Sequence, residues 1–160
     1  MRPVAVGGFA AVLVLGACTG GGDDGRSGRL PELELEDLDG GGATLDTGDL
    51  RGPAVVNLWA TWCKPCREEL PAFQQVAADR DDVRFVGVNS QETGDARAYL
   101  DELGITYDQF VDDRGRLAEE LGAAALPVTV VIDADGAVTA EHLGPMSVGD
   151  LEAALDDAGA

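Results

Sequence analysis

The sequence has very few of the residues that hold metal ions. It contains one histidine, His142, and three cysteines, Cys18, Cys63 and Cys66, among 160 residues. A structural zinc site normally takes four protein ligands, a catalytic one takes three, and an iron–sulfur cluster takes four cysteines. Because His142 is far from the cysteines in the sequence, no metal site is expected. Each cysteine therefore remains available for another task.

Positive charge is also scarce. Eleven Lys and Arg residues stand against 30 Asp and Glu, which gives a formal net charge of -19, and Lys64 is the only lysine. A strongly acidic surface repels phosphate groups. Nucleic acids and anionic lipid headgroups are therefore not expected as partners.

Long hydrophobic runs are missing apart from one near the amino terminus, Val4–Leu15. A helix that spans a bilayer needs about 20 apolar residues, so this run is too short. It follows Arg2 and precedes small residues, which is typical of a secretory signal. Its end, Leu15-Gly16-Ala17-Cys18, resembles a bacterial lipobox. That resemblance implies a signal peptide over 1–17 and a lipid on Cys18. The alternatives are a plain secretory signal or an uncleaved anchor.

Residues 18–29 are rich in Gly and otherwise mostly polar, and they offer little to bury, which predicts a flexible tether. The remaining residues, 30–160, are enough for one domain with a substantial core.

The domain is predicted to alternate strands and helices. Apolar patterns and turn residues indicate strands at Leu33–Glu36, Ala43–Leu45, Val55–Ala60, Val83–Asn89, Val128–Ile132 and Ala137–His142. Helices are expected from the cysteine pair to about Ala78 (with Pro71 inside), and over Gly94–Leu103, Arg114–Leu121 and Val148–Leu155; Tyr107–Val111 is expected to be a short extended piece. This order predicts an α/β fold, with a mixed sheet covered by helices.

The feature with the clearest chemistry is Trp62-Cys63-Lys64-Pro65-Cys66, directly after the apolar run Val55–Ala60. A Cys-x-x-Cys pair at a strand-to-helix junction is typical of proteins that make, break or shuttle disulfides. Pro65 suits the first turn of a helix. Cys63 is therefore expected at the helix start, where free N–H groups favour a thiolate, and Cys66 is expected to be buried one turn deeper. Lys64 adds positive charge that favours the Cys63 thiolate.

Two stretches resemble the thioredoxin superfamily, most of all the membrane-tethered thiol–disulfide oxidoreductases of the TlpA/ResA type. The stretches are Val56–Pro71, around the cysteine pair, and Leu126–Asp133, followed by Asp135-Gly136. The resemblance covers the chain from about Leu30 to its end. It implies a thioredoxin fold, in which helices flank a central mixed β-sheet and an N-terminal β-hairpin is added.

The resemblance also implies how a substrate is held. Pro127 is expected to be a cis-proline that faces the cysteine pair. Leu126 is expected to expose its backbone to the substrate chain. Trp62, Lys64 and Pro65 are expected to form the rest of the contact surface.

The predicted site also needs a proton carrier for Cys66. Relatives in the cytosol carry a buried aspartate where this chain has Asn57, which cannot ionise. In the ResA-like branch a loop glutamate does related work, and this nominates Glu92. The alternative is that Glu92 is an ordinary exposed acid. Glu68-Glu69 is expected to be a solvated helix face.

The expected function is dithiol–disulfide exchange outside the cytoplasm, with no cofactor besides the Cys63–Cys66 disulfide. Cys63 attacks a substrate disulfide and Cys66 resolves the mixed disulfide. The resemblance implies a reductant on the outer face of the cell membrane, whose clients are exported protein disulfides such as those of apocytochrome c. It would be recharged by an upstream membrane thiol reductant, and a monomer is expected.

Three other functions remain open at this point. The chain is a disulfide-forming oxidant or isomerase if its reduction potential is high. It is a non-catalytic binding module if the disulfide is permanent. A peroxide-reducing peroxiredoxin is the third, but that group has a P-x-x-x-T-x-x-C arrangement, whereas Trp59-Ala60-Thr61-Trp62 precedes Cys63 here.

Overall fold

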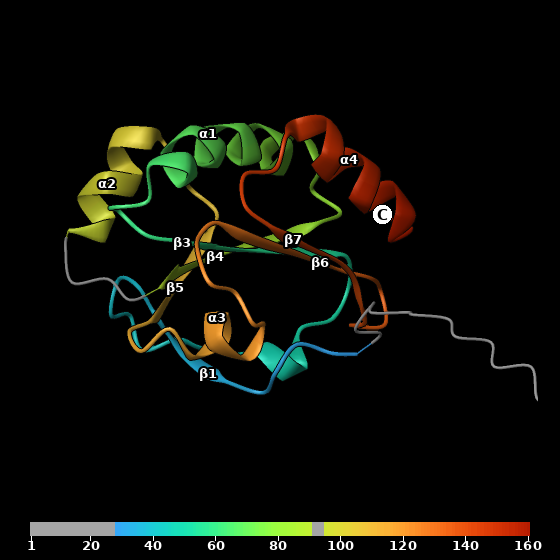
Figure 1. Ribbon diagram of the computed structural model, residues 1–160, viewed down its shortest axis with the longest axis horizontal. Coiled ribbons are helices and arrows are strands. Elements are labelled where there is room, and N and C mark those ends of the chain that lie inside the picture. Colours follow the sequence, from blue (N-terminus) through green and yellow to red (C-terminus); the bar gives the residue numbers. More distant parts are fainter. Residues whose placement is uncertain (1–27, 91–94) are drawn as a thin grey trace, which may run out of the picture.

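The computed structural model describes residues 28–90 and 95–160. Within them, a seven-stranded mixed sheet has the strand order β2-β1-β5-β4-β3-β6-β7 (Figure 1). The strands are β1 (Glu34–Asp37), β2 (Thr44–Asp46), β3 (Ala54–Trp59), β4 (Arg84–Ser90), β5 (Asp108–Asp112), β6 (Val128–Ile132) and β7 (Val138–Leu143). The helices are α1 (Lys64–Asp79), α2 (Ala96–Leu103), α3 (Arg116–Glu120), α4 (Val148–Asp157) and a 3-10 turn, η1 (Thr47–Asp49).

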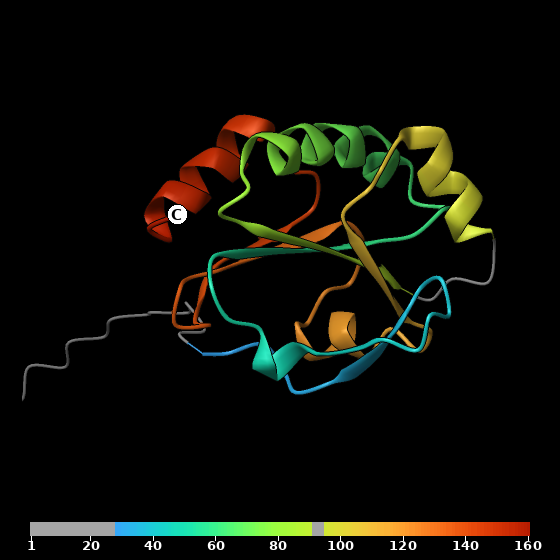
Figure 2. The ribbon, with the colours of Figure 1, turned by 180° about the vertical axis from the view of Figure 1, so that it is seen from behind.

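The helices lie on both faces of the sheet. Figures 1 and 2 show α1, α2 and α4 together on one face, and α3 with η1 on the other. Strand β3 is buried along its whole length because it lies between these layers. It pairs in parallel with β4 and antiparallel with β6. The predicted mixed sheet with flanking helices is therefore confirmed, and its central strand leads straight into the cysteine pair.

The predicted N-terminal hairpin is confirmed as well. Strands β1 and β2 pair antiparallel, with Leu35 opposite Leu45. Both leucines are buried in the core on the α3 side of the sheet. The turn after β2 is fixed by Thr47, whose hydroxyl donates to the carbonyl of Pro31 and accepts from the N–H of Leu33. The hairpin thereby covers an edge of the sheet that would otherwise be exposed.

The segment expected to be a short extended piece is a full strand, β5. It lies inside the sheet, between β1 and β4. Its polar residues Gln109 and Asp112 are buried. The Asp112 carboxylate accepts the free N–H groups of Arg116 and Leu117 at 3.0 and 2.8 Å, and so caps α3. The expected extended piece is thus confirmed as a strand, and its place inside the sheet depends on pairings that the local pattern does not show.

The amino-terminal expectations lie outside the described residues. These are the signal peptide over 1–17, the tether over 18–29 as far as residue 27, and the lipid on Cys18. Among residues 28–90 and 95–160, no helix is long and apolar enough to cross a bilayer.

Candidate active site

The cysteine pair lies at the junction between β3 and α1, as predicted. Cys63 is the N-cap residue of α1, and Pro65 is in its first turn. Cys63 and Cys66 form a disulfide. The backbone N–H of Cys66 donates to the Cys63 sulfur at 3.3 Å. When the disulfide opens, this N–H and the helix N-terminus stabilise negative charge on Cys63.

The two sulfurs differ in surroundings. Cys66 is fully buried and Cys63 is 3% exposed. Lys64, the next residue after Cys63, is exposed. The other nearby cation, Arg67, bonds Glu102 at 2.5 Å and lies over the Tyr99 ring, 5.4 Å from its centroid. Both cysteines thus lie in one apolar cluster, but only Cys63 keeps some exposed surface and has a lysine as its next residue.

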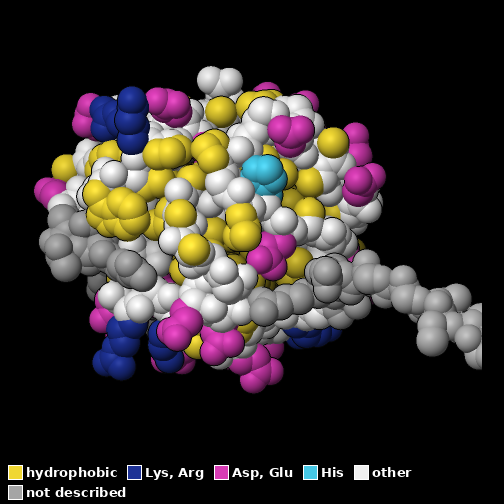
Figure 3. Space-filling view, viewed as in Figure 1, with side chains coloured by type: hydrophobic (Ala, Val, Ile, Leu, Met, Phe, Trp, Pro, Cys, Tyr) yellow, Lys and Arg dark blue, Asp and Glu magenta, His cyan; other side chains and the backbone are white. Residues whose placement is uncertain are grey.

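The residues expected to contact a substrate gather around the disulfide. Trp62 is 61% exposed. The Leu126–Pro127 peptide bond is cis, as the resemblance implies. Leu126 packs against the apolar cluster that contains Cys63 and Cys66. Figure 3 shows the face of the molecule that is seen in Figure 1. Apolar side chains lie across the middle of this face, and most charged side chains lie towards its rim.

Trp59 supports the site from inside. It is fully buried, and its ring stacks on that of Tyr99 with centroids 5.5 Å apart. Its indole N–H donates to Gln109 Oε1 at 2.9 Å. These contacts fix the end of β3, and with it the start of the Cys-x-x-Cys turn.

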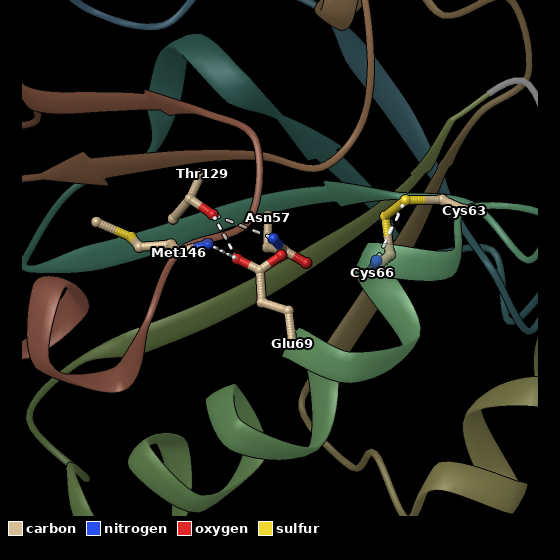
Figure 4. The surroundings of a disulfide bond; sticks show 6 residues. All are labelled: Asn57, Cys63, Cys66, Glu69, Thr129 and Met146. Atoms are coloured by element: carbon tan, nitrogen blue, oxygen red, sulfur yellow. Dashed lines mark hydrogen bonds between the residues drawn. A yellow bond between two sulfur atoms is a disulfide. The ribbon is translucent and has the colours of Figure 1, made fainter.

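Glu69 is a candidate functional residue that the sequence analysis missed. It was expected on a solvated helix face, but it is buried, with 5% of its surface exposed. Its Oε1 accepts from the N–H of Met146 at 3.3 Å and from the hydroxyl of Thr129 at 3.4 Å. That hydroxyl in turn accepts from the amide of Asn57 at 3.2 Å. Figure 4 shows the carboxyl group on the same side of α1 as the disulfide.

Burial raises the pKa of Glu69 from its ordinary value of 4.5 to about 7. The hydrogen bonds from Met146, Thr129 and Asn57 oppose this shift and only partly offset it. Two acceptors, Glu69 Oε2 and Asn57 Oδ1, are buried without a hydrogen-bond partner among the described residues. A protonated carboxyl group supplies a donor that this environment lacks. Glu69 is therefore poised to hold or release a proton near neutral pH.

The helical pattern contains the signal that identifies Glu69. Cys66, Glu69, Leu70 and Phe73 are spaced i, i+3, i+4 and i+7, so they share one face of α1, and all four are buried. Glu68 falls on the opposite side and is exposed, as expected. Glu92, the acid nominated from the sequence, lies outside the described residues.

The raised pKa of Glu69 predicts a pH-dependent stability. An acid with a raised folded pKa stays protonated in the folded chain while the unfolded chain has already lost the proton, so stability falls as pH rises from about 4.5 to about 7. A shift of this size corresponds to about 3 kcal/mol. Glu69→Gln removes this loss. Urea titrations give the free energy of unfolding of Glu69→Gln and of the unmodified oxidised chain. The difference, variant minus unmodified chain, should rise by about 3 kcal/mol as pH rises from about 4.5 to about 7.

The neighbouring variant Glu68→Gln is the matched control, because its side chain is exposed. Its difference from the unmodified chain should stay flat over the same range. A flat difference for Glu69→Gln as well would mean that Glu69 ionises normally in the folded chain.

The described residues contain no group of three or more His, Cys, Asp or Glu side chains arranged to hold a metal ion.

Comparison with known proteins agrees with this geometry. The model of the AhpC/TSA family matches residues 27–141. The chain belongs to the AhpC/TSA family. The thioredoxin-like protein YneN of Bacillus subtilis is 33% identical over 134 residues, which are 80% of this chain and 77% of YneN. The thiol-disulfide oxidoreductase ResA of Bacillus anthracis is 28% identical over 131 residues, 79% of this chain and 75% of ResA.

A solved structure shares the fold. The thiol:disulfide interchange protein DsbE of Chlorobium tepidum superposes with a TM-score of 0.72 at 25% identity, covering 82% of this chain and 96% of that one. The resemblance to thioredoxin-like thiol–disulfide oxidoreductases and the thioredoxin fold are thereby confirmed. This AhpC/TSA member is an enzyme of the DsbE/ResA type, with Cys63 and Cys66 as its Cys-x-x-Cys pair.

Proposed function

We propose that this oxidoreductase works outside the cytoplasm as a reductant of exported protein disulfides, held at the outer face of the cell membrane by a lipid on Cys18. Apocytochrome c is the proposed client, and a membrane thiol reductant recharges the chain. The observation that carries the proposal is the position of the disulfide: Cys63 at the start of α1 beside the cis-Pro127 loop, and Cys66 buried one turn from Glu69.

The proposed reaction uses each of these groups. In the reduced chain, the Cys63 thiolate attacks a substrate disulfide, and one substrate sulfur leaves as a thiolate. Cys66 then loses its proton, attacks the Cys63 sulfur of the mixed disulfide and releases the second substrate sulfur. The substrate gains two electrons from the chain, its two thiolates take up protons from water, and the chain is left with the Cys63–Cys66 disulfide.

Glu69 is the proposed proton carrier for Cys66. The two residues are three positions apart on α1, on the same buried face. With a pKa of about 7, Glu69 takes the Cys66 proton during substrate reduction and returns one when the chain is recharged. The role assigned to Glu92 from the sequence is thus proposed for Glu69 instead.

The same acid favours reduction over oxidation as the direction of the reaction. Strong oxidants of this kind have a stabilised reduced form. Here an ionised Glu69 places negative charge beside buried Cys66, which disfavours a second thiolate there. Burial of Cys66 acts in the same sense. Both effects destabilise the ionised dithiol and so lower the reduction potential.

The test is the reduction potential of Cys63–Cys66, measured by equilibrating the full chain with glutathione and dithiothreitol buffers. A reductant is expected to fall well below the value of disulfide isomerases, about -180 mV. A value near that of the strong oxidant DsbA, about -120 mV, would reverse the direction and indicate disulfide formation. A disulfide that does not exchange with either buffer would identify a permanent bond, and with it a binding module.

A further inference from the structure

A small pocket opens beside the disulfide, on the side of the cis-Pro127 loop that faces α3. It has a volume of about 70 Å³ and is lined by Trp62, Ser90, Ala118, Ala123, Ala124, Ala125 and Leu126. Four of these residues are alanines, whose short side chains leave this space open. In Figure 1, the segment from α3 to β6, which carries Ala123–Leu126, crosses the face seen in Figure 3.

Two residues connect this pocket to the redox site. Trp62 precedes Cys63 directly and stands exposed at the pocket. Leu126 lines the pocket and also packs against the cluster that contains Cys63 and Cys66. A polypeptide whose cysteine reacts with Cys63 therefore has its neighbouring residues beside the pocket.

The pocket contains a polar group that lacks a partner. Ser90, the last residue of β4, is 1% exposed. Its hydroxyl has no hydrogen-bond partner among the described residues. Buried hydroxyl groups are rarely left unpaired, because the lost hydrogen bond to water is not replaced. An unpaired hydroxyl in a pocket beside a reactive disulfide is therefore suited to pair with a bound substrate.

The size and lining of the pocket restrict the occupant. A water molecule, which has one heavy atom, needs roughly 10–15 Å³ of pocket volume. A pocket of about 70 Å³ therefore has room for roughly five heavy atoms. Trp62, Leu126 and the alanines offer apolar contact, and none of the described lining residues is charged. A side chain that fits is small, uncharged and partly apolar, with one group that bonds a hydroxyl. Threonine has this size and chemistry.

We propose that this pocket recognises a threonine-like side chain next to the reacting cysteine of the substrate, with Ser90 as the specificity-determining residue. This rests on the proposed function, because it assumes that a polypeptide disulfide reacts at Cys63. It narrows the substrate class to exported proteins in which a small hydroxyl-bearing residue flanks the cysteine. Bulky or charged residues at that position are disfavoured.

The test uses the reduced full chain and the disulfide-closed peptide Gly-X-Cys-Gly-Gly-Cys-X-Gly, with X as threonine or valine. The two side chains have the same shape, and only threonine has a hydroxyl. One hydrogen bond should favour the threonine peptide by about three- to tenfold in kcat/KM. Ser90→Ala should remove this preference. Thr44→Ala is the control, because it deletes an exposed hydroxyl group on β2, at the far edge of the sheet. It should retain both the preference and the rate.

A second variant guards against misfolding of the first. Ala123→Leu fills the pocket from its wall, and should slow the threonine and valine peptides towards the rate of a peptide with X as glycine. The inference is overturned if the unmodified chain treats threonine and valine alike, or if the preference survives in Ser90→Ala. Failure of the dithiol to transfer electrons even to glutathione disulfide would instead overturn the proposed function.

Discussion

Cys63→Ser is expected to abolish disulfide exchange, down to the rate without enzyme, whereas Cys66→Ser should stop the reaction halfway. Cys63 is at the helix N-terminus and its sulfur accepts the N–H of Cys66, so it is the sulfur that forms a stabilised thiolate. A serine hydroxyl in its place is a much weaker nucleophile than the thiolate at neutral pH. Cys66 is fully buried, so it reaches only the Cys63 sulfur of a mixed disulfide.

The two variants differ in whether they still form a mixed disulfide with a substrate. Incubated with a disulfide-closed peptide, the reduced Cys66→Ser chain should accumulate a covalent adduct, seen by mass spectrometry as the mass of the chain plus the peptide. The Cys63→Ser chain should form none. If the adduct appears on Cys66 in the Cys63→Ser chain instead, the roles of the two cysteines are the reverse of those proposed.

Glu69→Gln is expected to slow the recharging of the oxidised chain by up to about 100-fold below pH 7, the lower range for a well-placed general acid. When a thiol reductant attacks Cys63, the Cys66 sulfur leaves into a buried site that disfavours a thiolate. A protonated Glu69 supplies the proton needed there. Glutamine keeps the size and most hydrogen bonds of glutamate but has no acidic proton.

The pH profile separates this role from a structural one. Below about pH 7 Glu69 is protonated, so the rate constant per reductant thiolate should fall as pH rises through that value. Stopped-flow reduction of the oxidised chain, followed by tryptophan fluorescence, gives this constant. The inflection should be absent in Glu69→Gln and present in Glu68→Gln. An unchanged inflection in Glu69→Gln would assign the proton to another group.

Much of the fold was predictable because local patterns and tertiary packing agree. The apolar run at β3, the proline in the first turn of α1 and the turn at Asp135-Gly136 each indicate an element that is present. The place of strand β5 inside the sheet was not predictable in this way, because its pairings and the partners of its buried polar residues are tertiary. Gln109 is satisfied by Trp59, and Asp112 by the N-terminus of α3.

Glu69 shows the limit of reading charge from sequence alone. It stands next to exposed Glu68, and a charged pair on a helix usually faces water. The stripe formed with Cys66, Leu70 and Phe73 indicates otherwise, but nothing local says what receives the carboxyl group. Thr129 and Met146 do so from positions at least 60 residues away.

The sequence by itself determined the chemistry of this protein. Two cysteines one turn apart at a strand-to-helix junction identify the reacting groups and favour disulfide exchange, because spacing and helix position are local properties. Only the tertiary structure decided which groups surround the cysteines. Which acid is buried beside Cys66, and which hydroxyl lies unpaired in the pocket at Trp62, depend on segments that meet only when the sheet and its helices pack together.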